Sequence, residues 1–278
     1  MTGQPKIELH MHLAPEAPST AADFRRALAA YAAEAAGCGA RYVEASFAPC
    51  RPVRDGLSWE TVFEGYCDGV AEAAERHGIV VRLTPDLERG DPVEVAEEAA
   101  RHAVRYRDRG VVGLGLAGDE DTPAKPYATA FDIARDGGLG ILPHAGYTAG
   151  PDSVRDVLGL GADRIRHGIR AAEDPDLLAE LADRGIVLDI CPTADLRCPG
   201  AARPAADLLP ALVAAGVRCT VNTGRPAEYG IDLAGEHELA ATFGLTPRAA
   251  YAAGIAGARC DEATRTWLVK QSRKADWR

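Results

Sequence analysis

The feature that most constrains the fold is a set of eight short apolar runs, most of them followed by a longer, alanine-rich helical stretch that carries charges. The runs are Ile7 to His12, Tyr42 to Ala48, Ile79 to Leu83, Val111 to Leu116, Gly140 to His144, Arg164 to His167, Ile186 to Cys191 and Val217 to Asn222. Glycine often marks the return from helix to strand, as at Gly78, Gly110 and Gly185. Strands that alternate with helices form parallel sheets, and eight such units close into a barrel. We therefore expect an α/β fold, a single (β/α)8 TIM barrel that takes in residues 1–278.

Charge and hydropathy limit the partners of the chain. Its 278 residues carry a formal charge of -10, which disfavours binding to nucleic acid. No apolar run approaches the roughly 20 residues that span a membrane, and the N-terminus lacks the apolar core of a secretory signal. The seven cysteines include no CxxC pair, which is typical of reduced thiols. We therefore expect a cytoplasmic protein that binds a small-molecule substrate, and neither nucleic acid nor a membrane.

Histidines gather at the ends of the predicted strands, where a TIM barrel places its active site. Four of the seven stand there: His10, His12, His144 and His167. His10 and His12 are two residues apart, so both side chains point to the same face of a strand. Two adjacent imidazoles suit a divalent metal, and His144 could supply a third nitrogen. Histidines held by hydrogen bonds without a metal remain the alternative.

The strand ends resemble the adenosine and adenosine-monophosphate deaminase branch of the amidohydrolase superfamily. The matching segments, in the family's order, are residues 5–13, residues 111–120, His144-Ala145-Gly146, residues 161–168, Cys191-Pro192-Thr193 and Asn222-Thr223. In that family the two histidines of the first strand, the histidine of the fifth and an aspartate of the eighth bind zinc. The resemblance therefore implies His10, His12 and His144 as metal ligands, and it matches His167 to the histidine that helps activate water.

Five positions that hold acids in the family have lost them here. Gly224 and Arg225 stand in place of two aspartates of the eighth strand, and Tyr147 stands in place of the general-acid glutamate. Ala14 and Gly115 replace two further aspartates. We expect Arg225 to place a guanidinium beside the vacated ligand position, where it would repel a dication. The losses predict that no metal or other cofactor is bound, with zinc or another divalent ion on the three histidines as the alternative.

The replacements predict acid–base chemistry by four catalytic residues: Tyr147, His167, His144 and Arg225. The reaction would be an isomerisation, elimination or cyclisation of a small nucleoside-like or anionic substrate. Five residues would bind that substrate: Gly118, Asp119, Glu120, Thr193 and Asn222. Arg51, Arg166 and Arg197 are further cations expected near the rim. Two alternatives stay open, a divergent metal-dependent purine or nucleoside deaminase or other hydrolase, and a binding protein without catalytic activity.

The segment that follows the first strand is short. Family members carry a long helical insertion there, which helps to roof the pocket, whereas here only Ala14 to Thr20 precede the first helix. The resemblance therefore implies a more open pocket, or one covered by a second subunit of a homo-oligomer. The alanine-, glycine- and arginine-rich composition is typical of GC-rich bacterial genomes, where such proteins often serve specialised metabolism.

Overall fold

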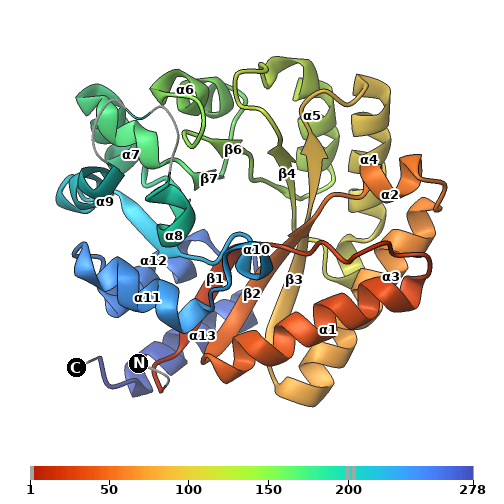
Figure 1. Cartoon of the computed structure of the whole chain (residues 1–278), viewed down its shortest axis with the longest axis horizontal. Helices are drawn as coiled ribbons and strands as arrows, with labels where there is room; N and C mark the ends of the chain where they lie inside the picture. The colour runs from red at the N-terminus through yellow and green to blue at the C-terminus, as the bar shows by residue number, and fades with distance from the viewer. Residues whose placement is uncertain (1–2, 198–200, 202–204, 278) are drawn as a thin grey trace.

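Parallel strands form the centre of the molecule, and helices cover their outer side (Figure 1). The computed structural model describes residues 3–197, 201 and 205–277. One sheet has the order β1 (Lys6–His12), β2 (Ala40–Phe47), β3 (Val80–Glu88), β4 (Gly113–Ala117) and β5 (Gly140–Ile141). The other has the order β6 (His144–Ala145), β7 (Arg164–His167), β8 (Val187–Ile190) and β9 (Arg218–Val221). Within each sheet, every strand pairs in parallel with the next one along the chain.

Strands β5 and β6 are two halves of one barrel strand. Pro143 lies between them and has no N–H to donate to a neighbouring strand. The backbone pairing nevertheless continues, because Leu142 N donates to Leu114 O at 2.9 Å and Arg166 N donates to Pro143 O at 2.9 Å. The two sheets are therefore continuous on this side.

The barrel closes between β9 and β1. Gly224 follows β9, and its N donates to His10 O at 3.0 Å while its O accepts from His12 N at 2.7 Å. With β5 and β6 taken as one, the described residues form a closed barrel of eight parallel strands. The predicted TIM barrel is confirmed.

Helices follow most of the strands. Their bounds are α1 (Ala21–Gly37), α2 (Cys50–Arg54), α3 (Trp59–His77), α4 (Val93–Arg105), α5 (Ala128–Asp136), α6 (Pro151–Gly159), α7 (Pro175–Arg184), α8 (Pro192–Asp195), α9 (Ala205–Ala214), α10 (Pro226–Tyr229), α11 (Leu233–Thr242), α12 (Pro247–Gly257) and α13 (Glu262–Lys274), with short 3-10 turns at Arg107–Arg109, Lys125–Tyr127 and Ile169–Glu173. Their ends follow local chemistry. At the start of α3, Ser58 Oγ accepts from Thr61 N at 3.1 Å, and Gly78 ends the helix with a φ of 62°.

Helices α1 and α3 pack closely against each other over β2. Gly65 permits the approach, because an added Cβ there would collide with the carbonyl oxygen of Ala21. The ring of Tyr66 lies 5.1 Å from that of Phe24 and 4.3 Å from that of Phe47, between centroids. Burying each such ring stabilises the fold by roughly 1.5–3 kcal/mol. This core holds β2 and, through it, β1.

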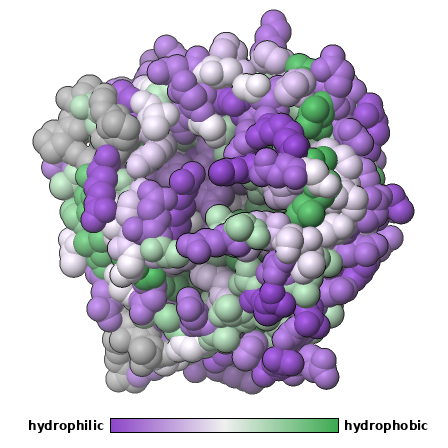
Figure 2. Space-filling model, turned by 45° about the vertical axis from the view of Figure 1, so that its right-hand side comes forward, coloured by the Kyte–Doolittle hydropathy of each residue, from purple (hydrophilic) through white to green (hydrophobic). Residues whose placement is uncertain are grey.

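The link between β1 and α1 is short, as predicted. It consists of residues 13–20 and contains no helix. No helix in the described part of the chain is both long and apolar enough to cross a membrane. On the face shown in Figure 2, hydrophilic residues predominate and hydrophobic residues form small separate groups. That face shows no extended apolar surface of the kind that obligate dimers bury.

Candidate metal centre

Four histidines meet at the carboxyl ends of the strands. His10 and His12 come from β1, His144 from β6 and His167 from β7. The Nε2 atoms of His10, His12 and His144 lie 3.0–3.1 Å from one another. His10 is fully buried, whereas the side chain of His12 is 19% exposed, so the centre faces solvent on the His12 side.

A register irregularity in β1 aims these side chains into the barrel. Glu8 and His10 are two residues apart and would share a face in a regular strand. Yet Glu8 bonds to Tyr31 on α1, outside the barrel, while His10 faces the other histidines. The pairing of β1 with β2 shifts between Glu8 and Met11. Asn222 Oδ1 holds this bulge by accepting from two successive amides, Leu9 N at 2.7 Å and His10 N at 3.2 Å.

The hydrogen bonds made by Nδ1, the ring nitrogen that faces away from the centre, fix the position of the proton on two of the histidines. His144 Nδ1 lies 3.1 Å from the Leu116 carbonyl oxygen, which can only accept, so Nδ1 carries the proton. Ser46 Oγ donates its single proton to Met11 O at 2.9 Å, and it therefore accepts from His12 Nδ1 at 3.0 Å. The Nε2 atoms of His12 and His144 consequently face each other at 3.1 Å with lone pairs and no proton.

A cation bound between these nitrogens would accept their lone pairs. Burial lowers the pKa of His10, His12 and His144 well below the ordinary histidine value, and neighbouring imidazoles and Arg166 lower it further. Neutral imidazole is the form that binds metal ions. Catalytic zinc is often held by three protein ligands with the fourth position open, at Zn–N distances of about 2.0–2.1 Å. The three imidazoles fit such an ion.

His167 stands beside the three ligands, oriented from both sides. Its Nδ1 lies 2.7 Å from Asp195 Oδ1, and its ring stacks on Tyr147 at 4.5 Å between centroids. Arg166 and His167 are adjacent and would point to opposite faces of a regular strand. A φ of 63° at His167 turns the chain instead, so that both side chains face the barrel interior. Such a backbone angle is uncommon outside glycine and is often found at functional sites.

A buried ion pair forms the floor of the centre. Arg166 bonds to Asp86, and its Nη2 donates to Thr84 Oγ1 at 2.6 Å. Asp86 Oδ2 lies 3.5 Å from His12 Nδ1. Burial raises the pKa of Asp86 to about 6, although Arg166 opposes the shift. Gly115 makes room for the pair, because an added Cβ there would overlap Asp86 Oδ1. Arg166, expected near the rim, therefore lies in the barrel interior.

Two of the predicted substrate-binding residues serve the protein's own backbone. Glu120 Oε2 accepts from Tyr147 N, Thr148 N and Ala149 N, each at 2.9 Å, and so shapes the loop after β6. Asn222 is fully buried. Its Oδ1 accepts from the backbone of β1, and its Nδ2 donates to Ile190 O and Thr220 Oγ1.

The other three predicted substrate-binding residues lie in loops at the strand ends. Gly118 and Asp119 are exposed after β4, and Gly118 has a φ of 94°. Thr193 is half-buried at the start of α8, where its N donates to Glu236 Oε2 at 2.9 Å. These positions leave Gly118, Asp119 and Thr193 within the loops from which a TIM barrel builds its site.

Sequence reasoning missed three residues that orient the histidines: Asp195, Ser46 and Asp86. Asp195 comes two residues after Cys191-Pro192-Thr193, a motif that the sequence analysis did single out. An acidic residue so close to a matched motif was the signal that could have identified it. No pattern marks Ser46 or Asp86. They reach the site because β2 pairs with β1 and β3 pairs with β2.

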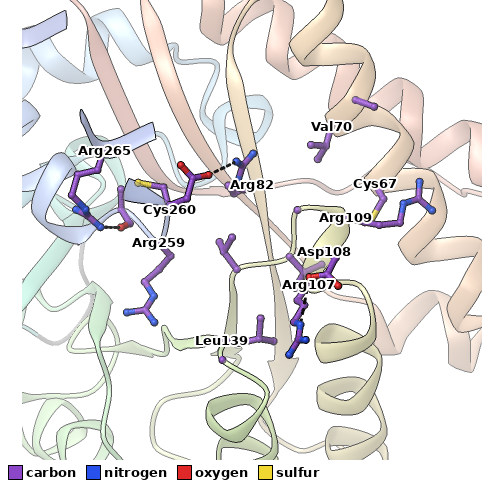
Figure 3. A pocket seen from close by; sticks show the side chains of 17 residues that line it. Cys67, Val70, Arg82, Arg107, Asp108, Arg109, Leu139, Arg259, Cys260 and Arg265 are labelled. Atoms are coloured by element: carbon purple, nitrogen blue, oxygen red, sulfur yellow. Dashed lines mark hydrogen bonds and ion pairs between the residues drawn. The ribbon is translucent and has the colours of Figure 1, made fainter. Parts of the chain in front are cut away.

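A large cavity lies at the opposite end of the barrel. It measures about 980 Å³ and is lined around the starts of β3, β4 and β5 (Figure 3). Several of its arginines are committed to protein partners: Arg109 to Asp68 at 2.6 Å, and Arg265 Nη2 to Ala258 O at 2.9 Å. Helix C-termini collect at this end and attract cations. Because it lies at the other end of the barrel and none of the four histidines lines it, the cavity is separate from the histidine centre.

The comparison with protein families covers nearly the whole chain. The family model described as adenosine deaminase matches residues 7–271. The chain belongs to the adenosine deaminase family. It is an enzyme of that family, in agreement with the order of its motifs.

Similar proteins from the adenosine deaminase family include two named deaminases. An aminodeoxyfutalosine deaminase from Acidothermus cellulolyticus is 46% identical over 267 residues, which cover 92% of this chain and 75% of that protein. An adenine deaminase from Chelativorans sp. is 38% identical over 255 residues, which cover 90% and 78%.

Solved structures show the same fold. An amidohydrolase from Burkholderia ambifaria with bound zinc superposes with a TM-score of 0.89 at 24% identity, covering 98% of this chain and 90% of that one. An adenine deaminase from Arthrobacter aurescens superposes with a TM-score of 0.88 at 22% identity, covering 98% of each chain.

The expectation of a site without a metal is wrong. It depended on the lost acids and on Arg225 repelling a dication, but the Arg225 side chain is 63% exposed and its Nη1 lies 3.2 Å from Glu228 Oε2. The three imidazoles of this adenosine deaminase family chain are arranged so that they could hold a metal ion, and the amidohydrolase of the same fold from Burkholderia ambifaria contains zinc. Metal-free isomerisation, elimination and cyclisation, which followed from that expectation, have no support.

Proposed function

We propose that this chain is a metal-dependent deaminase that removes the exocyclic amino group of an adenine base, either free or within a nucleoside-like compound. Each turnover consumes one water and releases one ammonia. The observation that carries the proposal is the convergence of three imidazole Nε2 atoms, at 3.0–3.1 Å, of which those of His12 and His144 have outer partners that leave their lone pairs facing inward. Relatives named aminodeoxyfutalosine deaminase and adenine deaminase support the substrate class.

His10, His12 and His144 would hold zinc. Zinc held in this way supplies Lewis acidity, which makes water a stronger nucleophile near neutral pH. Gly224 cannot supply the carboxylate ligand that the family places there, so the protein contributes three neutral ligands. Three histidines without a carboxylate suffice for catalytic zinc in other enzymes.

His167 and Tyr147 would move the protons. His167 Nε2 accepts a proton from the attacking water, since Nδ1 is occupied by Asp195. The Tyr147 hydroxyl is the donor to the purine ring, in the place of the family's glutamate. A phenol with a pKa near 10 is a weaker acid than a carboxylic acid, so we expect slower turnover than a glutamate would give.

Loop residues at the strand ends would contact the substrate. Gly118, Asp119 and Thr193 are the candidates, because their loops open at the carboxyl ends of β4 and β8. Arg225 follows Gly224 and has an exposed guanidinium, so it is a candidate to meet an anionic substituent on the substrate. Glu120 and Asn222 act through the backbone that they hold.

The test is ammonia release by the zinc-loaded protein. Adenine, adenosine and aminodeoxyfutalosine would each be supplied, and ammonia would be measured by a coupled assay. We expect release from at least one of them, with both zinc and activity lost in His12→Ala. His77→Ala, which removes an exposed imidazole at the end of α3, is the matched control and should keep both. Zinc-loaded protein that releases no ammonia from any of the three would refute the proposal.

A further inference from the structure

Asp195 is bound on both of its oxygens and is almost completely buried. Oδ1 lies 2.7 Å from His167 Nδ1, and Oδ2 accepts from Cys191 N at 2.7 Å. Asp195 is 2% exposed and ends α8, the short helix after β8. Because the backbone N–H of Cys191 fixes one oxygen, the other has a fixed direction toward His167.

The ring of His167 has little freedom to turn. It stacks on Tyr147 with an interplanar angle of 21°, and it lies edge-on to His10 at 4.8 Å between centroids. A ring nitrogen of His167 lies within 4.8 Å of both a ring nitrogen of His10 and Cys191 Sγ. With Nδ1 turned to Asp195, the opposite nitrogen, Nε2, is the one available to the site.

We propose that Asp195 is a positioning residue that holds the proton of His167 on Nδ1 and so presents Nε2 to the three-histidine centre as a hydrogen-bond acceptor. A carboxylate oxygen can only accept, so His167 Nδ1 must donate to it. Asp195 itself contacts no reacting atom. Its effect on turnover rests on the proposed deaminase function, whereas its effect on the proton position does not.

The isosteric variant Asp195→Asn reverses the arrangement. Cys191 N–H is buried and needs an acceptor, and asparagine has one carbonyl oxygen to offer. That oxygen therefore stays on Cys191 N, and the NH2 group faces His167 Nδ1. An NH2 group can only donate, so the proton of His167 moves to Nε2.

Nitrogen NMR of the zinc-loaded protein, labelled with 15N at histidine, reads the proton position directly. The His167 signals are assigned by comparison with His167→Gln. We expect Nδ1–H in the unmodified protein and Nε2–H in Asp195→Asn. Glu236→Gln is the matched control, because Glu236 bonds to Thr193 in the same region and not to His167; it should leave Nδ1–H in place. Nε2–H in the unmodified protein, or the same proton position with and without Asp195, overturns the proposal.

A kinetic measurement tests the consequence for turnover. With a substrate that the unmodified enzyme deaminates, Asp195→Asn should lower kcat by about 10²–10⁴-fold. KM should change by less than about threefold, because Asp195 does not touch the substrate, and zinc content should not change. An unchanged kcat despite a moved proton would refute the positioning role. An unmodified enzyme that deaminates nothing would refute the proposed function and leave the NMR result to decide on Asp195.

Discussion

At the residue scale, Gly115, where the family has an acid, lies beside an acid of the neighbouring strand β3. The family's fourth-strand aspartate is absent, but the Asp86 carboxylate lies in the space that a side chain at Gly115 would need. Arg166 bonds to the same carboxylate. A carboxylate therefore lies beside His12 in this chain although Gly115 supplies none.

Restoring the family's residue should therefore destabilise this chain. Gly115→Asp would force its Cβ against Asp86 Oδ1 and bring two carboxylates together, which we expect to cost at least 2 kcal/mol, on the order of overpacking costs. Urea unfolding followed by circular dichroism measures the change. Gly159→Asp is the control, since nothing lies within 4 Å of a Cβ at that exposed position. Equal stability of the two variants would contradict the account of Gly115.

Sequence reasoning identified the residues that lie together at the strand ends, but it did not predict the contacts that some of them make. The histidines were placed correctly because motif order and strand ends suffice to locate them. The direction of Arg225 and the commitment of Asn222 were not predictable, since both depend on the turn at Gly224 and on a bulge in another strand. Asp86 lies beside Gly115 because the two are partners on paired strands, a contact that no spacing in the sequence reveals.

At the scale of elements, the bulge in β1 determines where the metal ligands point. Strand runs read from the sequence agree with the observed strands to within two residues, and Arg164–His167 agrees fully, except that β3 continues beyond Leu83 to Glu88. The split of the fifth strand at Pro143 and the shift after Glu8 are local departures from regular pairing, which apolar periodicity does not detect. Asn222 supports the second of these departures.

Removing the Asn222 side chain should loosen the metal centre from a distance. In Asn222→Ala, Leu9 N and His10 N lose their shared acceptor, and such buried donors cost about 1–3 kcal/mol each. Zinc affinity, measured by competition with a chelator, should fall about 10–100-fold. Thr242→Ala removes an exposed hydroxyl that bonds to Leu239 O and should change neither stability nor affinity. Unaltered zinc affinity in Asn222→Ala would show that the metal centre does not depend on the hydrogen bonds from Asn222 to the bulge.

At the scale of the whole molecule, charged residues form much of the barrel interior. Arg164 pairs with Glu44 at 2.6 Å and with Asp189 at 2.7 Å, below the layer of Arg166 and Asp86, and all are buried. Such pairs need both partners, because one charge left alone in the interior is strongly unfavourable.

Breaking one interior pair should therefore cost far more than breaking a surface pair. Asp86→Ala leaves the Arg166 guanidinium without its counter-charge, and we expect a loss of about 3–5 kcal/mol in the free energy of unfolding. Glu228→Ala, which removes the partner of the exposed Arg225, should cost less than about 1 kcal/mol. Comparable losses in the two variants, in denaturant titrations, would argue against a charged interior that depends on pairing.

Zinc should stabilise the barrel as a whole, because its ligands come from both sheets. His10 and His12 belong to the sheet that begins with β1, and His144 begins the sheet of β6 to β9. At free zinc 100-fold above its Kd, binding should add about 2.7 kcal/mol to the stability and raise Tm, and a chelator should reverse the gain. The rise in Tm should vanish in His12→Ala. A rise that persists there would place the ion elsewhere.

The most direct test of the central claim is anomalous diffraction at the zinc edge from crystals of the zinc-loaded protein. We predict a single strong peak among the Nε2 atoms of His10, His12 and His144, at about 2.0–2.1 Å from each. A centre without anomalous density, with the zinc bound at other residues, would contradict the account.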